Sequence, residues 1–302
     1  MSWLAFVLII FSAFLHASWN LIAKKERMTL AFYTLLCTGP AILWCHTQFW
    51  TPMHVLDFPW KFWLILGGSV TCDIIYAWGL ANAYKLLDMS AAYPMMRALP
   101  LLLTALVTTL CGLGEALSPM AIIGMFVVFA GCMCMPLKSF SDFNIRSYLS
   151  VNMFFVLVTA CGTTGYTIFD SMAQDVLKPV AESMDVSKPV MSVTYYSTRG
   201  IALTSTLTLI TLLIRSERQK WIGFIRELNY RPFLAGVFAS ATYVSVLIAM
   251  NYVTNVSFVQ VFRQMGLVIA LALGIFILKE KGTLPKFTGV TLIIAGLIMS
   301  VL

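Results

Sequence analysis

Residues 90–119, SAAYPMMRALPLLLTALVTTLCGLGEALSP, decide the fold that we predict for this chain. The stretch is a long apolar run with a single arginine, Arg97, at the depth where the hydrocarbon of a bilayer would lie. A related run at residues 257–285 carries Arg263 in the matching place. A charge at bilayer depth costs on the order of 3 kcal/mol or more, so each intramembrane arginine is a functional-site hypothesis.

The composition of the whole chain indicates a membrane protein. Of its 302 residues 60% are hydrophobic and 11% are charged, whereas soluble domains have about 25% charged residues. The mean hydropathy is +0.86. The net charge of +7 would suggest a nucleic-acid partner in a soluble protein. Here most cations fall in short connectors between apolar runs, where they set membrane orientation, and a nucleic-acid partner is excluded.

Apolar windows of about 20 residues, long enough to cross a bilayer core of about 30 Å, recur along the chain. We therefore predict an all-α membrane protein with ten transmembrane helices. The windows are 2–23, 29–46, 60–82, 90–111, 118–137, 148–169, 190–214, 231–253, 256–278 and 284–302. The two longer connectors, residues 47–59 and 171–189, are expected to be solvated linkers on the outer side.

The basic residues divide unequally between the two sides of the predicted membrane. The connectors that follow the odd-numbered helices carry fourteen Lys and Arg residues, and those on the other side carry three. The positive-inside rule makes the first side cytoplasmic. Both chain termini are therefore expected on the outer side.

A repeat relates the two halves of the chain. Tyr76 precedes Tyr243 by 167 residues, Arg97 precedes Arg263 by 166, and Glu115 precedes its counterpart Glu280 by 165. We therefore predict a five-helix repeat in residues 1–140 and a second in residues 141–302. Because five is odd, the second repeat is inverted relative to the first. Inverted repeats are the architecture of secondary transporters, which bind substrate near the midplane.

Four charged residues are expected near mid-membrane, too deep to reach the headgroups: Asp73, Arg97, Arg199 and Arg263. Three arginines against one aspartate leave a surplus of about two positive charges. A guanidinium fork suits a carboxylate or phosphate, which favours an anionic substrate. Structural ion pairing is the alternative. Asp73 is interpreted either as a proton-coupling site or as a counter-ion.

Further polar residues are candidates for the same substrate cavity, and each could equally pack between helices. His16, Trp19 and Asn20 share one face of the first helix. The others are Tyr76, Tyr93, Tyr195, Tyr196, Tyr243, Gln260 and Gln264. Since the sequence contains no nucleophile with a paired base, no metal-ligand cluster and no phosphate loop, we expect no catalytic residue, no metal and no cofactor.

Several motifs resemble the EamA-type drug/metabolite transporters over essentially the full length. They are HASWNLIAKK at residues 16–25, the YPxxR segment at 93–97, GEALSP at 114–119 and the AG pairs at 130–131 and 295–296. The resemblance implies a ten-helix basket of two inverted repeats. It also implies transport of small metabolites across the plasma membrane, here a bacterial inner membrane, often outward and often linked to protons.

The three deep arginines set this sequence apart and favour an anionic metabolite, such as a carboxylate, a phosphate or a phosphonate. Two alternatives stay open. One is an exporter of amino acids or drugs in which the arginines are paired structurally. The other, of a different class, is a membrane scaffold or lipid-handling partner that transports nothing.

Overall fold

The computed structural model describes residues 2–24, 29–86, 89–144, 151, 153–276 and 282–301. Residues 17–24, 84, 89–94, 270, 273–274 and 276 are described by their backbone alone. The elements of the first half are α1 Trp3–Lys24, α2 Leu30–Cys45, α3 Thr47–Trp50, η1 Val55–Asp57, α4 Trp60–Leu86, α5 Met89–Cys111, α6 Pro119–Cys134 and η2 Phe140–Asp142. Those of the second half are α7 Met153–Ser183, α8 Lys188–Leu213, α9 Arg215–Arg226, α10 Arg231–Met250, α11 Ser257–Phe262, α12 Met265–Phe276 and α13 Leu284–Met299.

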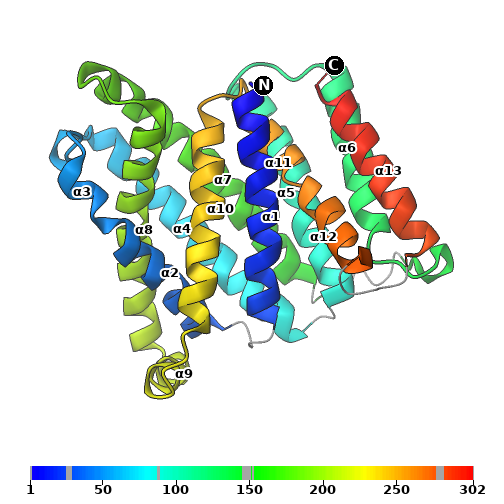
Figure 1. Cartoon of the computed structure of the whole chain (residues 1–302), viewed down its shortest axis with the longest axis horizontal. Coiled ribbons are helices and arrows are strands. Elements are labelled where there is room, and N and C mark those ends of the chain that lie inside the picture. The colour runs from blue at the N-terminus through cyan, green and yellow to red at the C-terminus, as the bar shows by residue number, and fades with distance from the viewer. Residues whose placement is uncertain are drawn as a thin grey trace.

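The prediction of an all-α membrane protein is confirmed, because the described residues form helices and no strand (Figure 1). Each predicted window contains at least one helix. Within the described ranges, four segments are long and apolar enough to cross a membrane, and the bent α8–α9 pair counts as a fifth. The four are Leu30–Trp50, Trp60–Ala83, Met153–Ser183 and Arg231–Met250. Ten membrane crossings stay a prediction.

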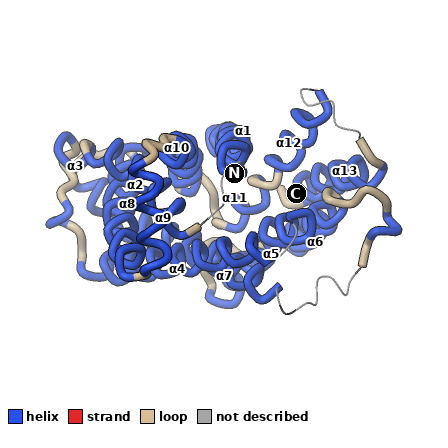
Figure 2. Tube along the Cα trace, turned by 90° about the horizontal axis from the view of Figure 1, so that it is seen from below, coloured by secondary structure: helices blue, strands red, loops and turns tan. Residues whose placement is uncertain are grey.

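The helices stand in two rows when the molecule is seen end on (Figure 2). One row contains α10, α1 and α12, and the facing row contains α4, α7 and α5. The most extensive helix contacts join α4 to α7, α1 to α10, and α6 to α13. Both termini lie at the same end of the bundle (Figure 1).

Two reciprocal glycine contacts bring α6 and α13 together as an antiparallel pair. A Cβ atom added to Gly124 would lie 2.6 Å from the carbonyl oxygen of Gly296, and one added to Gly289 would lie 2.8 Å from that of Gly131. Real Cβ atoms do not approach backbone this closely, so these positions require glycine. Small residues of this kind let helix backbones approach in a membrane.

The prediction that residues 171–189 are a solvated linker is wrong, because α7 continues to Ser183. Ala173, Leu177 and Ala181 recur every four residues and are buried against the bundle. The charged residues between them lower the hydropathy of this segment, which ended the apolar window too early. Asp170, which falls between the predicted window 148–169 and the predicted linker 171–189, lies in the interior of α7.

The connector at residues 47–59 also differs from a solvated linker. It contains the short helices α3 and η1, and its Met53 and Phe58 side chains are buried. The apolar side chains of this segment therefore pack onto the bundle.

The window at residues 256–278 does not form one continuous helix. It divides into α11 and α12, and the break falls at Arg263 and Gln264. The arginine that the repeat predicts thus lies where the helix is interrupted, which leaves backbone groups available for other partners.

Candidate functional site

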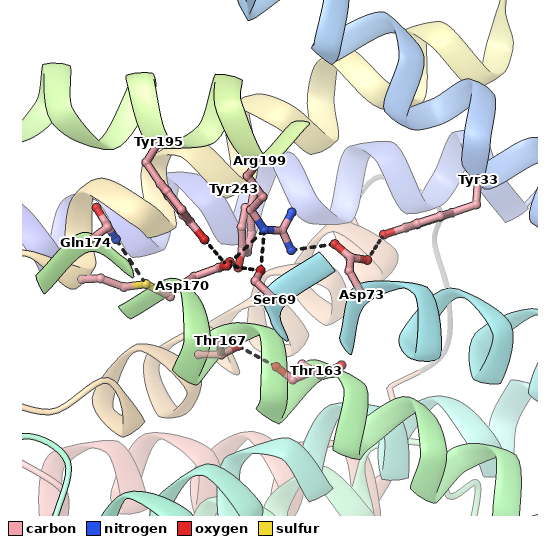
Figure 3. Close-up of polar contacts among 11 residues, drawn as sticks. Tyr33, Ser69, Asp73, Thr163, Thr167, Asp170, Gln174, Tyr195, Arg199 and Tyr243 are labelled. Carbon is pink, nitrogen blue, oxygen red and sulfur yellow. Dashed lines mark hydrogen bonds and ion pairs between the residues drawn. The ribbon is translucent and has the colours of Figure 1, made fainter. Parts of the chain in front are cut away.

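Polar side chains line the facing sides of several central helices. On α4, Ser69 and Asp73 are four residues apart and share one face. On α7, a polar stripe runs along the helix (Figure 3). Its members Thr163, Thr167, Asp170 and Gln174 follow at intervals of three or four residues. Such stripes converge only where helices pack side by side, as α4 and α7 do.

The Arg199 side chain of α8 lies between these two faces and is 3% exposed. Its Nη2 atom donates to Asp73 Oδ2 at 2.7 Å. Its Nε atom donates to Asp170 Oδ1 at 3.0 Å and to Ser69 Oγ at 2.9 Å (Figure 3). One cation is therefore shared by two buried carboxylates from different halves of the chain.

Hydroxyl groups complete the coordination of both carboxylates. Tyr33 donates to Asp73 Oδ1 at 2.7 Å, and Tyr195 donates to Asp170 Oδ1 at 2.5 Å. Tyr243 donates to Asp170 Oδ2, and the Ser69 hydroxyl donates to Asp170 Oδ1. We refer to this set as the Arg199 cluster: Tyr33, Ser69, Asp73, Asp170, Tyr195, Arg199 and Tyr243. Buried charges require such pairing and hydrogen bonding, and here they have both.

A cavity of about 110 Å³ lies beside the cluster. Asp73, Arg199 and Tyr243 of the cluster line it, and so does Arg263. Both halves of the chain supply further lining residues, among them His16, Tyr76, Tyr166 and Tyr196. Five tyrosines and several apolar residues thus line the cavity together with a few charged groups, a combination that is typical of small-molecule sites.

Arg263 differs from Arg199 in its partners. Its side chain lines the cavity and is 9% exposed. Among the described residues, no carboxylate lies within ion-pair distance of its guanidinium group. Its backbone carbonyl, at the break between α11 and α12, accepts a hydrogen bond from Arg97 Nη2 at 2.8 Å.

The formal charges around the cavity balance. Arg199 contributes +1 and the carboxylates of Asp73 and Asp170 contribute −2, so the cluster sums to −1. Adding +1 for Arg263 brings the total to zero. The expected surplus of two positive charges at mid-membrane is therefore wrong. With Arg97 included, three arginines against two carboxylates leave a surplus of one positive charge. The predicted surplus was larger because it did not count Asp170.

Arg97 differs from Arg263, its counterpart in the repeat, in its relation to the cavity. It is not among the described residues that line the cavity. Its Nη1 atom lies 3.2 Å from His16 Nε2, and its carbonyl accepts a hydrogen bond from Gln264 Nε2 at 3.0 Å. The hydrogen bonds of Arg97 with the Gln264 side chain and with the Arg263 carbonyl join α5 to the break between α11 and α12.

The remaining predicted residues divide into three groups. His16, Tyr76 and Tyr196 line the cavity, as described above. Gln260 instead donates to Thr167 at 2.6 Å, a contact between buried side chains. The side chains of Trp19, Asn20 and Tyr93 lie outside the described part of the structure. Glu280 also lies outside it.

Sequence reasoning missed Asp170, Tyr33, Ser69 and Tyr166 as site residues. For Asp170 a signal existed, because it continues the polar stripe of Thr163 and Thr167 at helical spacing. Ser69 likewise precedes Asp73 by one helical turn. Tyr33 gave no such signal, since its partner Asp73 is 40 residues away along the chain.

The comparisons with known proteins bear on fold and family. A crystal structure of another protein is similar over 98% of this chain and 95% of its own length, with a TM-score of 0.66 and 16% sequence identity. At that identity the likeness shows the fold alone. No curated protein matches the chain. Residues 184–302 match the EamA-like transporter family. Over these residues the match confirms the resemblance to the EamA-type transporters that the motifs indicate.

Proposed function

We propose that the protein is a secondary transporter of a small molecule with an anionic group, which binds in the cavity beside the Arg199 cluster. The observation that carries this proposal is Arg263, whose guanidinium group lines the cavity and has no carboxylate within ion-pair distance in the described residues. A guanidinium fork binds a carboxylate or phosphate through two parallel hydrogen bonds. The unpaired cation thus provides the specific contact, and the tyrosine rings provide apolar surface.

The proposed architecture is ten transmembrane helices in two inverted repeats, residues 1–140 and 141–302. The helix contacts support it, because α4 against α7 and α10 against α1 would be equivalent pairs under such symmetry. The reciprocal contacts of Gly124 with Gly296 and of Gly131 with Gly289 fit a two-fold relation as well. Lining residues from both halves fit a substrate site between the repeats.

The proposed location is a bacterial inner membrane with both termini outside. The unequal division of Lys and Arg between the connectors supports this orientation. The position of both termini at one end of the bundle is consistent with it (Figure 1).

An amino acid is the second candidate substrate. Asp73 lines the same cavity as Arg263, so a carboxylate and a guanidinium group are both present to receive a zwitterion. The structural pairing of Arg199 also agrees with the exporter alternative. Asp73 and Tyr33 together form the proposed point of proton coupling, since a buried carboxylate is a common element of proton relays.

Flux into proteoliposomes tests the proposal. Uptake of labelled monoanions and of labelled amino acids is measured for the wild type, for Arg263→Gln and for Lys178→Gln, a control that removes an exposed cation. We expect flux of one of the two substrate classes, its loss in Arg263→Gln and its retention in the control. Undiminished flux in Arg263→Gln would contradict the role of Arg263. Absence of flux for every solute would favour a scaffold or lipid-handling protein.

A further inference from the structure

The connector between α8 and α10 contains a helix that no part of the proposed transport mechanism uses. Helix α9 has 12 residues and leaves α8 at an angle of 112°. It lies at the end of the bundle opposite to the chain termini (Figure 1). If α8 crosses the membrane, a helix bent by this angle runs along the membrane surface.

One face of α9 is attached to the beginning of α2. Glu217, Trp221 and Phe224 follow at helical spacing and share this face. The Glu217 Oε2 atom accepts a hydrogen bond from the Ala31 backbone N–H at 2.9 Å. The Phe224 ring meets the buried Phe32 ring edge to face, with the ring centroids 6.1 Å apart. A carboxylate at a helix N-terminus satisfies a free N–H group and complements the helix dipole.

A second face of α9 carries exposed cations. Arg215, Arg218, Ile222 and Arg226 follow at intervals of three or four residues and share this face. All three arginines are exposed, and within the described ranges none has a carboxylate at ion-pair distance. The acidic residue of the helix, Glu217, is already engaged by Lys220 and by α2.

Apolar side chains border these cations and face outward. Leu213 and Ile214 immediately precede α9, Ile225 lies within it, and Leu228 follows it, and all four are exposed. Helices that combine exposed arginines with exposed isoleucine and leucine lie in the interface of a bilayer, with the cations at the headgroups. The charge is complementary to anionic phospholipids.

We propose that α9 binds anionic phospholipid headgroups through Arg215, Arg218 and Arg226, and that this binding holds the N-terminal end of α2 in place. The end of α2 that α9 contacts is close in sequence to a member of the Arg199 cluster. Tyr33, which donates to Asp73, lies two residues after Ala31. The lipid charge therefore acts on the helix end that positions one hydroxyl donor of the Arg199 cluster.

Thermal unfolding of the full chain in nanodiscs tests the binding. Neutral phosphatidylcholine is replaced in steps by phosphatidylglycerol, and we expect the Tm of the wild type to rise with the anionic fraction. Each arginine at a membrane surface changes the affinity for anionic lipid about fivefold, so the triple variant Arg215→Gln/Arg218→Gln/Arg226→Gln is expected to lose about 100-fold. Its Tm should then be nearly independent of phosphatidylglycerol.

The matched control removes three exposed cations elsewhere, in Lys61→Gln/Lys85→Gln/Lys138→Gln. This variant should keep the wild-type response to phosphatidylglycerol. An equal loss in the control would overturn the assignment to α9, because total charge would then explain the effect. A wild-type response in the triple arginine variant would overturn it as well.

Hydrogen exchange at the N-terminus of α2 tests the second part. Anionic lipid should slow exchange of the Ala31 amide in the wild type and leave it unchanged in the triple arginine variant. Glu217→Ala, which removes the acceptor of the Ala31 N–H, should keep the Tm response and lose the protection of this amide. Equal protection by purely neutral lipid would contradict the proposal and indicate another partner for α9. Neither readout requires a substrate, so both are independent of the proposed transport.

Discussion

Arg199 and Arg263 line the same cavity, yet their surroundings differ in kind. Arg199 is shared by two carboxylates, and three tyrosine hydroxyls donate to those carboxylates. Arg263 lies at a helix break, and in the described residues no carboxylate pairs with it. The sequence makes the two residues look alike, as single arginines in apolar runs.

The difference separates two uses of a buried charge. A charge with its full set of partners is part of the fold, and its removal leaves the partners uncompensated. A charge without a partner that faces a cavity has its binding capacity free for a ligand. We therefore expect substitutions at Arg199 to act on stability and substitutions at Arg263 to act on binding.

The largest effect is expected for Arg199→Gln, which leaves Asp73 and Asp170 buried without a cation. Breaking a buried ion pair from one side costs about 3–5 kcal/mol of unfolding free energy. Thermal unfolding in detergent measures this loss. The double variant Arg199→Gln/Asp170→Asn removes one of the stranded charges and should recover part of the stability. Additive losses in the double variant would contradict the coupling of Arg199 to Asp170.

Arg263→Gln is expected to raise the half-saturating substrate concentration in flux assays by about 10- to 100-fold, because the variant loses a pair of charge-assisted hydrogen bonds to the substrate. Its unfolding free energy should change by less than about 1 kcal/mol, since no carboxylate is left stranded. A loss of stability comparable to that of Arg199→Gln would remove the distinction between the two arginines.

Tyr243→Phe removes one of the hydroxyl donors to Asp170 and keeps the ring. A hydrogen bond to a charged group contributes about 1.5–3 kcal/mol, and we expect the lower value because Arg199, Ser69 and Tyr195 still donate. The matched control is Tyr230→Phe, where the side chain is exposed. Equal unfolding temperatures for the two variants would speak against a closed hydrogen-bond network.

The smallest effect is expected at the exposed pair of Lys178 and Asp175, whose Nζ and Oδ1 atoms are 2.5 Å apart. The side chains are 36% and 61% exposed, and such pairs contribute about 0–1 kcal/mol. Asp175→Asn should therefore change the unfolding free energy by less than about 0.5 kcal/mol. A larger loss would mean that distance rather than burial governs these ion pairs.

Much of the helical arrangement could be predicted from the sequence, because hydrocarbon demands long apolar segments and the charges must fall between them. The limits appear at the ends of α7 and in the break of α11 and α12. Residues 170–183 of α7 bury one face in protein. Their average hydropathy does not reveal this face, because the polar residues of the other face lower the average. The break at Arg263 and Gln264 depends on contacts with α5, 166 or more residues away.

The candidate site was predictable in its residue types and much less in its pairing. Arg199, Arg263, Asp73 and Tyr243 are recognisable because polar residues are rare at bilayer depth. Which arginine is neutralised depends on whether Asp170 faces α8, and this follows from helix packing rather than from local sequence. One overlooked carboxylate changes the interpretation of Arg199 from a substrate contact to a structural element.

Ligand-dependent thermal stabilisation of the purified protein tests the central claim most directly. A ligand that binds the folded state raises Tm by mass action, so the wild type and Arg263→Gln are compared over a panel of carboxylates, phosphates, phosphonates and amino acids. We predict that at least one compound with an anionic group raises the Tm of the wild type and leaves that of Arg263→Gln unchanged. An undiminished rise in Arg263→Gln would contradict the assignment of Arg263 as the ligand-binding arginine.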